Sequence, residues 1–259
     1  MTITILTDNF PGDNTGAEHG LSYLIEHDGK KLLFDAGKSD LFLKNASAMG
    51  IDIADIDMII LSHGHFDHGG GLEYLEGGTL VCHPKCFVKR YRNKDNSYIG
   101  LKNSRDDISK KFNLILAEKP YKISDRIYFS GEIPRITGFE SQSTSFEFED
   151  GTPDFVMDDS AAGFLLKDGL FVVTGCGHSG IVNTLEHMRE ITGTDKIYGI
   201  MGGFHLKEID RQTRETIQYL KDNKVQHVYP SHCTAPPVLS LFLKTFDAEQ
   251  VVTGGVFEF

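Results

Sequence analysis

The sequence predicts an α/β protein with four layers, in which two mixed β-sheets pack face to face and helices cover their outer faces (an αββα sandwich). Two observations predict this fold class: the chain falls into two strand-rich halves, and each half also carries helices. With 259 residues, the chain is long enough to bury the large core that such a sandwich needs. We therefore expect one domain that spans residues 1–259.

The first half reads as strands with a single helix among them. The helix is expected where apolar residues recur at helical spacing between a Ser/Asp cap and Gly50. The pair Asp28-Gly29 is typical of a tight turn between two strands. The apolar run DMIILSHGH has strand length and indicates a strand buried on both faces. The predicted elements are strands at 2–8, 20–28, 30–37 and 57–65 and a helix at 39–51.

The second half repeats this alternation. A strand pair joined by Asp168-Gly169 comes first, and a helix with a Ser cap and a Gly stop follows it. Strands and helices then alternate to the end of the chain. The predicted elements are a strand pair at 161–175, strands at 196–203 and 225–232, and helices at 179–193, 208–223 and 236–246.

A long stretch at about residues 85–155 separates the two halves and has a weaker pattern. It contains a basic segment at 89–111 and an acidic one at 139–155. A connection of this length inside a compact domain often serves as a lid or as a wall of the substrate site. Additional strands and surface decoration are an equally good interpretation.

The stretch LSHGHFDHGG at residues 61–70 concentrates three histidines and an aspartate. Alternate residues of an extended segment point the same way, so His63 and His65 are expected to converge on one metal ion. Asp67 and His68 follow in the turn and face a second ion. Imidazole and carboxylate ligands suit zinc, iron or manganese. We therefore expect two divalent ions, zinc in the first place, rather than a surface loop with adventitious metal affinity.

Further ligands must come from downstream, because four side chains cannot complete two metal sites. Three stretches qualify: TGCGHSG with Cys176 and His178, MGGFHL with His205, and YPSHCT with His232 and Cys233. Each follows a predicted strand, which places all three at the sheet edge of His63. His205 is also a candidate general acid or a donor to a substrate phosphate or carboxylate. A histidine at a helix start without a chemical role is the competing interpretation.

The motif HGHFDH resembles the H-x-H-x-D-H signature of the metallo-β-lactamase superfamily, whose fold is the αββα sandwich. The preceding LLFDAG also resembles the superfamily, which implies that Asp35 orients a metal ligand. The resemblance extends over nearly the whole chain. It implies that His63, His65 and His178 hold one metal ion. Asp67, His68 and His232 would hold the second. Cys176 stands where the superfamily normally has a bridging aspartate, so the bridge is Cys176, water alone or nothing.

Four further segments resemble one branch, the dihydropteroate-synthase-related group of ribofuranosylaminobenzene-phosphate (dihydropterin) synthase-like proteins. These segments are AEHGLSYLIE, TGCGHSGIVN, GGFHL and PSHCT. The resemblance implies that Glu18 and His19 line the same cleft as the metals. The basic run around Arg90 suggests that this arginine receives an anionic substrate, although a solvated surface is the competing interpretation.

The composition limits which classes of binding partner and which cellular compartment we expect. The net charge of −11 disfavours nucleic acid, because an acidic surface repels phosphates. No apolar run approaches the length of a membrane span, so no membrane partner is expected. Four irregularly spaced cysteines do not read as a disulfide framework, and a reducing cytoplasm is the expected compartment. The expected partner is a small anionic molecule, and an oligomer is compatible with the sequence.

These observations favour a metal-dependent hydrolase, or a transferase or synthase, that acts on a small anionic metabolite, with phosphorylated heteroaromatic molecules included. Two metals would lower the pKa of a bridging water toward neutrality and so provide a hydroxide nucleophile. Asp67 would orient that water besides binding metal. The alternative, motivated by the altered position at Cys176, is a metal-containing ligand-sensing or regulatory protein with little turnover. Di-iron redox chemistry ranks last, because the chain has no flavin domain and few carboxylate ligands.

Overall fold

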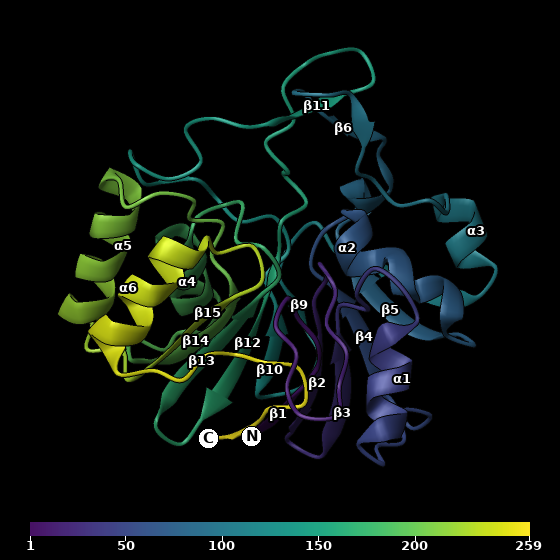
Figure 1. Cartoon of the computed structure of the whole chain (residues 1–259), viewed down its shortest axis with the longest axis horizontal. Coiled ribbons are helices and arrows are strands. Elements are labelled where there is room, and N and C mark those ends of the chain that lie inside the picture. Colours follow the sequence, from purple (N-terminus) through teal and green to yellow (C-terminus); the bar gives the residue numbers. More distant parts are fainter.

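The computed structural model describes all 259 residues and has four layers (Figure 1). Two β-sheets lie face to face in the middle of the molecule. Outside one sheet lie α4 (Ile181–Thr192), α5 (Arg211–Asp222) and α6 (Pro236–Phe246), and outside the other lie α1 (Leu41–Ala48) and α3 (Arg105–Ser109). The predicted αββα sandwich is confirmed.

The first sheet has seven strands in the order β16-β1-β2-β3-β4-β5-β8. Strands β16 to β3 pair in antiparallel fashion, whereas β3, β4, β5 and β8 run parallel. The strands are β1 (Thr2–Thr7), β2 (Ser22–His27), β3 (Lys30–Phe34), β4 (Met58–Leu61), β5 (Gly78–Cys82), β8 (Phe112–Leu116) and β16 (Val256–Glu258). The predicted turn between β2 and β3 has positive φ at both Asp28 (52°) and Gly29 (70°), as a two-residue hairpin requires.

The second sheet has six strands in the order β15-β14-β13-β12-β10-β9. Strands β13, β14 and β15 run parallel, and the other pairs are antiparallel. The strands are β9 (Tyr121–Lys122), β10 (Ile127–Phe129), β12 (Ala161–Leu166), β13 (Gly169–Thr174), β14 (Ile197–Gly203) and β15 (His227–Ser231). Each sheet is therefore mixed, and each has a parallel part whose strand ends can carry side chains to a common site.

The stretch at residues 85–155 contributes to all three sheets of the molecule. It supplies β8 to the first sheet and β9 and β10 to the second. It also forms a small third sheet of β6 (Arg90–Arg92), β7 (Ser97–Tyr98) and β11 (Phe146–Phe148), in the order β11-β6-β7. Figure 1 shows β6 and β11 beyond one end of the sandwich, opposite the end where the termini lie.

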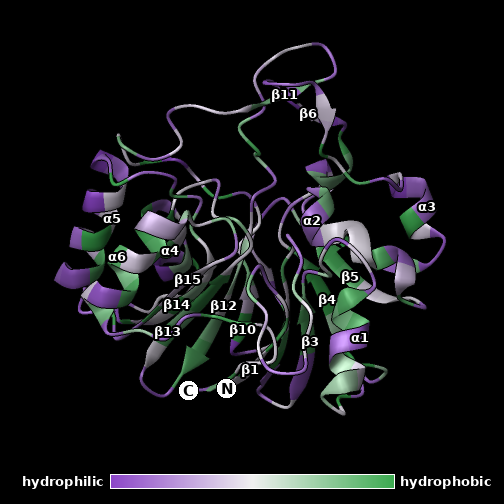
Figure 2. Cartoon of the chain, in the orientation of Figure 1, coloured by the Kyte–Doolittle hydropathy of each residue, from purple (hydrophilic) through white to green (hydrophobic).

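Three apolar clusters hold the layers together, and Figure 2 shows the apolar strands in the interior beside helices of mixed polarity. The cluster between the sheets includes Ile3, Phe34 and Phe164. Phe42 of α1 belongs to the second cluster, and Leu185 of α4 to the third, so each outer layer buries one face of its helices against a sheet.

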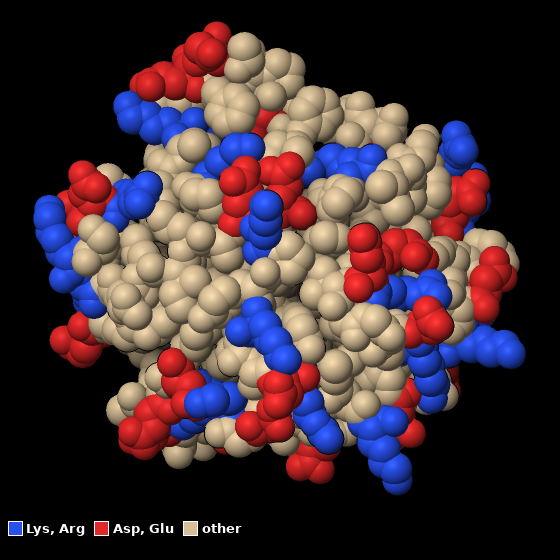
Figure 3. Space-filling model, turned by 180° about the vertical axis from the view of Figure 1, so that it is seen from behind, with Lys and Arg blue, Asp and Glu red and all other residues tan.

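The surface carries charges of both signs. Acidic and basic side chains are interspersed on the face shown in Figure 3. None of the helices combines the length and the apolar character that a membrane span requires.

Gly64, three residues after the end of β4, lies where two backbone segments come into close contact. A Cβ atom at this position would lie 1.9 Å from the carbonyl oxygen of Cys86, so only a glycine fits without a backbone shift. The glycine between the two histidines is thus explained by space and not by its φ angle.

We predict that Gly64→Ala lowers the free energy of unfolding by about 2–3 kcal/mol, because the added methyl group forces the two segments apart. Urea unfolding followed by circular dichroism measures the change. Gly138→Ala is the matched control, since its added Cβ meets no atom within 4 Å. Equal unfolding midpoints for the two variants would contradict the steric explanation.

Candidate metal centre

The candidate site lies where four strands from the parallel parts of the two sheets end. His63 follows β4, His178 follows β13, His205 follows β14 and His232 follows β15, while the short helix α2 (Phe66–Gly69) carries Asp67 and His68. All six predicted metal ligands lie together, and none is more than 9% exposed. The carboxyl ends of parallel strands meet at one end of an α/β fold, which is why residues so distant in sequence converge.

The first ligand set consists of His63, His65 and His178, whose ligand nitrogens lie within 4.8 Å of one another. Nε2 of His63 is 3.0 Å from Nδ1 of His65, and Nε2 of His178 is buried without a hydrogen-bond partner. Burial lowers the pKa of all three imidazoles well below their usual range. The rings are therefore neutral, which is the form that binds a metal ion.

The second set consists of Asp67, His68 and His232. Nε2 of His232 lies 3.1 Å from Nε2 of His68 and 3.4 Å from Oδ2 of Asp67. Burial opposes a charge on Asp67, but the surrounding histidines, His68 first among them, hold its pKa well below the usual range. The site thus contains an ionised carboxylate between imidazole nitrogens, a donor set that fits a divalent metal such as zinc.

Asp35 orients one histidine of each ligand set, His68 directly and His63 through Ser62. Its Oδ2 accepts a hydrogen bond from Ser62 Oγ (2.7 Å) and lies 2.7 Å from Nδ1 of His68. Ser62 Oγ in turn lies 2.9 Å from Nδ1 of His63, so the contacts occupy the Nδ1 atoms and leave Nε2 of both rings for a metal. Such contacts fix the ring orientation and the tautomer of a ligand. The structure places Asp35 where the resemblance led us to expect it.

His232 is held by residues that the sequence did not single out. Its Nδ1 lies 3.2 Å from Oδ1 of Asn9, and the Asn9 amide donates to the carbonyl oxygen of His232 at 2.7 Å. Asp8 accepts a hydrogen bond from the backbone N–H of His232 at 3.2 Å. In the sequence, Asp8 and Asn9 indicate only a polar loop, because nothing there shows that residue 9 meets residue 232.

Three residues at this end have strained backbones. Asp35, His205 and His232 have φ angles of 57°, 49° and 49°, in the left-handed region that costs a residue with a Cβ about 1–2 kcal/mol. Asp35 and His232 come directly after a strand and His205 comes two residues after one, and each has its backbone or side chain hydrogen-bonded by the site. The strain is therefore concentrated where side chains must point into one space.

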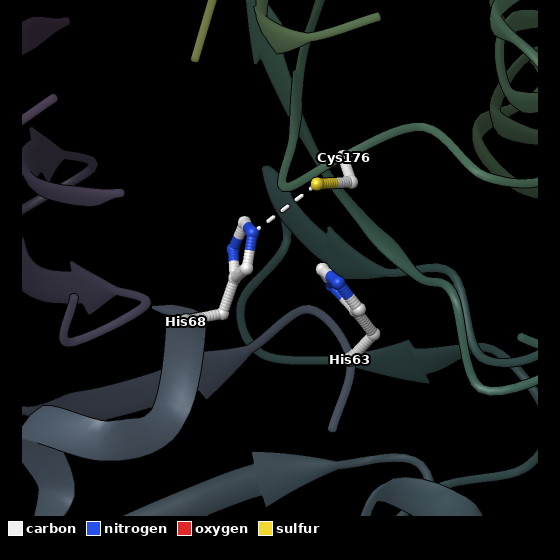
Figure 4. Close-up of side chains that lie close together, drawn as sticks. All are labelled: His63, His68 and Cys176. Atoms are coloured by element: carbon white, nitrogen blue, oxygen red, sulfur yellow. Dashed lines mark hydrogen bonds between the residues drawn. The ribbon is translucent and has the colours of Figure 1, made fainter. Parts of the chain in front are cut away.

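Cys176 points into the space between the two sets, and its Sγ lies 3.2 Å from Nε2 of His68 (Figure 4). Burial, together with the neighbouring Cys233, raises the pKa of this thiol well above its usual range. Cys233 packs beside it and donates a hydrogen bond to the carbonyl oxygen of Cys176. Position and chemistry both make Cys176 available to a metal, because a bound divalent ion favours the thiolate.

His205 lies beside the first set, with its ring centroid 4.3 Å from that of His178. Burial lowers the pKa of His205 to about 4, so the ring is neutral at neutral pH. A role as general acid would therefore require the charge of a bound anion to raise this pKa. As a neutral imidazole, the ring can still donate one hydrogen bond.

A cleft opens above the ligands and has two adjoining parts. The inner chamber, of about 340 Å³, is lined by His65, Asp67 and His178 of the two ligand sets and also by Arg92, Lys94 and Lys207. The outer chamber, of about 440 Å³, lies along residues 138–146 and the start of α5. Both chambers include Lys207 and Phe146, whose ring lies 4.9 Å from that of His65. The third sheet thus forms a wall of the site, an interpretation that the sequence left open.

Of the two residues expected at the cleft near the first loop, His19 lies at the site and Glu18 has another role. Nε2 of His19 lies 3.1 Å from Oδ2 of Asp67, and its ring stacks on that of His232. The carboxylate of Glu18 accepts hydrogen bonds from the backbone of Lys38 and from Ser39. Glu18 therefore holds a turn next to the cleft.

Arg90 requires a correction, because its side chain is only 1% exposed and cannot receive a substrate. It donates to Asp158 at 2.7 Å and lies 3.3 Å from Asp154. Asp158 also accepts a hydrogen bond from the backbone N–H of Gly64 at 2.7 Å. Through Asp158, the arginine thus stabilises the backbone of the segment that carries His63. The basic run gave no sign of this, since a charged residue between others normally lies on the surface.

Comparisons with known proteins agree with this geometry. A family model described as the metallo-beta-lactamase superfamily matches residues 15–86. An uncharacterized protein of Methanocaldococcus jannaschii is 36% identical over 242 residues, which cover 90% of each chain. From the same organism, 7,8-dihydropterin-6-methyl-4-(β-D-ribofuranosyl)-aminobenzene-5'-phosphate synthase is 32% identical and covers 100% of this chain and 97% of its own.

Solved structures show the same relationship. Tm1679, described as a metal-dependent hydrolase of the β-lactamase superfamily, matches with a TM-score of 0.89 and 29% identity over 100% of this chain and 99% of its own. Zn²⁺-bound PqqB of Methylobacterium extorquens shares the fold, with a TM-score of 0.59, 14% identity and full coverage of both chains (100%). The full-length relatives and the matched family model show that this chain belongs to the metallo-β-lactamase superfamily. Within the superfamily it belongs to the group that includes the M. jannaschii synthase named above.

Proposed function

We propose that the protein is a metal-dependent hydrolase, or a transferase of the same chemistry, that acts on a small anionic molecule at two divalent metal ions, zinc in the first place and iron or manganese as alternatives. One observation carries the proposal: two buried ligand sets lie together, and one cleft is lined by His65 and His178 of the first set and Asp67 of the second together with Arg92, Lys94 and Lys207. A basic border of this kind attracts anions even on a protein of net charge −11.

The residues around the two ligand sets have separate tasks in this proposal. Divalent ions bound by the two sets would supply Lewis acidity and acidify water. The ionised Asp67, which contacts His19 and His232, orients the attacking water or alcohol. Phe146 covers the histidines and limits access of bulk water. His205 donates a hydrogen bond to the leaving oxygen.

The choice between hydrolase and transferase depends on which nucleophile enters the cleft. Tm1679 is described as a hydrolase, whereas the relative from M. jannaschii is named as a synthase, so both outcomes occur among similar chains. The inner and outer chambers together give room for more than a water beside the anionic group. Turnover in the presence and absence of added amine or alcohol acceptors distinguishes the two.

A second candidate function is metal-dependent sensing of a small molecule with little turnover. Cys176 favours it, because a buried thiol with a raised pKa stands where the superfamily normally has a bridging carboxylate. A thiolate between the two ion positions would reduce their Lewis acidity. Tight binding of a metabolite that is recovered unchanged would support this function.

We predict that the protein, purified without added metal or chelator, contains about two zinc ions per chain, and that Asp67→Ala contains about one, because it removes the carboxylate of the second set. Elemental analysis by mass spectrometry gives both values. A single ion per chain that is unchanged in the variant would contradict a dinuclear site.

We also predict that His65→Ala abolishes hydrolysis of a panel of phosphoesters and lactones while the far-ultraviolet circular dichroism stays the same, since the first set loses one of three imidazoles. His227→Ala is the control, because His227 lies at the opposite end of β15 from His232. Full activity of His65→Ala would refute the proposed chemistry.

Asp35→Asn should weaken metal binding about 10- to 100-fold, because Oδ1 of Asp35 accepts from the backbone N–H of Ser62 while Oδ2 contacts Ser62 Oγ and His68 Nδ1, and an amide has only one acceptor atom for these contacts. Competition with a chromophoric chelator measures the affinity. Asp57→Asn, a change at a surface ion pair with Lys30, is the matched control. If both variants bind metal equally well, the orienting role of Asp35 is wrong.

A further inference from the structure

The four cysteines of the chain form two neighbouring pairs, Cys82 with Cys86 and Cys176 with Cys233. All four thiols are free. The Sγ atoms of Cys176 and Cys233 lie within 4.8 Å of each other. Two thiols this close can be joined by an oxidant that reaches them, so the surroundings of each pair decide its reactivity.

The second sheet brings Cys176 and Cys233 together across its strand β14. Cys176 comes two residues after β13, and Cys233 comes two residues after β15, which are the two neighbours of β14. The last residue of β14 is Gly203, where a Cβ atom would lie 2.7 Å from Sγ of Cys233 and 3.1 Å from Cα of Cys176. The missing side chain therefore lets cysteines from the flanking strands meet. Cys233 also donates a hydrogen bond to the carbonyl oxygen of Cys176 at 3.4 Å.

The two pairs differ in their access to the cleft. Cys176 and Cys233 both line the inner chamber, so a molecule as small as hydrogen peroxide reaches their sulfurs from solvent. Cys82 and Cys86 are completely buried in the apolar cluster that contains Phe42, and they line neither chamber. The chain thus carries one pair that is open to the cleft and a second pair that apolar side chains enclose.

We propose that Cys176 and Cys233 form a reversible oxidation site, at which a hydroperoxide joins the two sulfurs in a disulfide and withdraws Cys176 from the metal centre. One sulfur attacks the O–O bond and becomes a sulfenic acid, while the leaving oxygen takes up the thiol proton and departs as water. The second sulfur then displaces the hydroxyl group of the sulfenic acid, which departs with the second thiol proton as another water. Both sulfurs are oxidised and the peroxide is reduced, so no further reactant is needed.

The disulfide changes the contacts of two metal-site histidines. In the reduced chain, Sγ of Cys176 lies 3.2 Å from Nε2 of His68 (Figure 4). A disulfide holds its sulfurs about 2 Å apart, so Cys176 must turn away from His68 and toward Cys233. Cys233 directly follows His232, so the same bond displaces the backbone beside a second ligand. Oxidation should therefore release metal, and this consequence alone rests on the proposed function.

Peptide mass mapping tests the oxidation site on the zinc-loaded protein. Hydrogen peroxide is added, the protein is denatured and alkylated, and the masses of the chain and its tryptic peptides are measured. We expect the chain to lose two of its four free thiols and about 2 Da, with the peptides of Cys176 and Cys233 joined. Cys82 and Cys86 should stay reduced and serve as the internal control, and dithiothreitol should restore all four thiols.

Two variants assign the bond. Cys233→Ala should show no loss of 2 Da, because the partner sulfur is gone. Cys82→Ala is the matched control and should form the same link as the wild type, since its thiol lies outside the cleft. Circular dichroism checks that both variants fold, and the wild-type map decides the question if one does not. Absence of the link, equal oxidation of both pairs, or a sulfinic acid on a single cysteine would overturn the oxidation site.

A chromophoric chelator follows zinc during the same oxidation. We expect about one zinc ion per chain to be released as the disulfide forms, and to rebind after reduction. A disulfide that forms without release of zinc would overturn the link to the metal centre. A protein that contains no zinc and still forms the disulfide would refute the proposed function while the oxidation site stands.

Discussion

The buried carboxylate of Asp35 is the contact on which the whole site depends. It stands at the end of β3 in a left-handed backbone conformation and is completely buried, with hydrogen bonds to Ser62 and His68. Through Ser62 it also reaches His63, so one side chain fixes a ring from each ligand set. A buried carboxylate is expensive unless its oxygens are fully hydrogen-bonded, and here the partners that satisfy it are the groups that must be oriented.

Much of the fold could be predicted from the sequence because its signals are local. The hydrophobic periods, the Asp28-Gly29 turn and the glycine stops depend on neighbouring residues, and the structure has these elements where the patterns indicate them. The ligand sets could be grouped because each candidate follows a strand end, and parallel strand ends meet. The roles of Asn9, Ser62 and Phe146 could not be predicted, since they depend on which distant segments come into contact.

Arg90 shows why composition alone misleads at a functional site. Four basic residues within six positions read as a solvated or ligand-binding surface, yet one of them is among the largest fully buried side chains of the protein. Its charge is balanced by Asp158 and Asp154, which lie more than sixty residues away in sequence. Arg92, two residues further along the same strand, remains exposed and borders the inner chamber, so the first arginine of β6 has a structural role and the second contributes positive charge to the cleft.

The attachment of the small third sheet has a kinetic consequence. Its strand β6 is fixed to the metal-site segment by Arg90 and Asp158, and Ile99 and Gly100 next to β7 pair with Phe66 and His65. A wall bonded in this way cannot swing open without disturbing the ligands, so a substrate meets a cleft that is already shaped. For the anionic substrate proposed above, capture would then require no closing motion, and diffusion and the charges around the cleft would govern association.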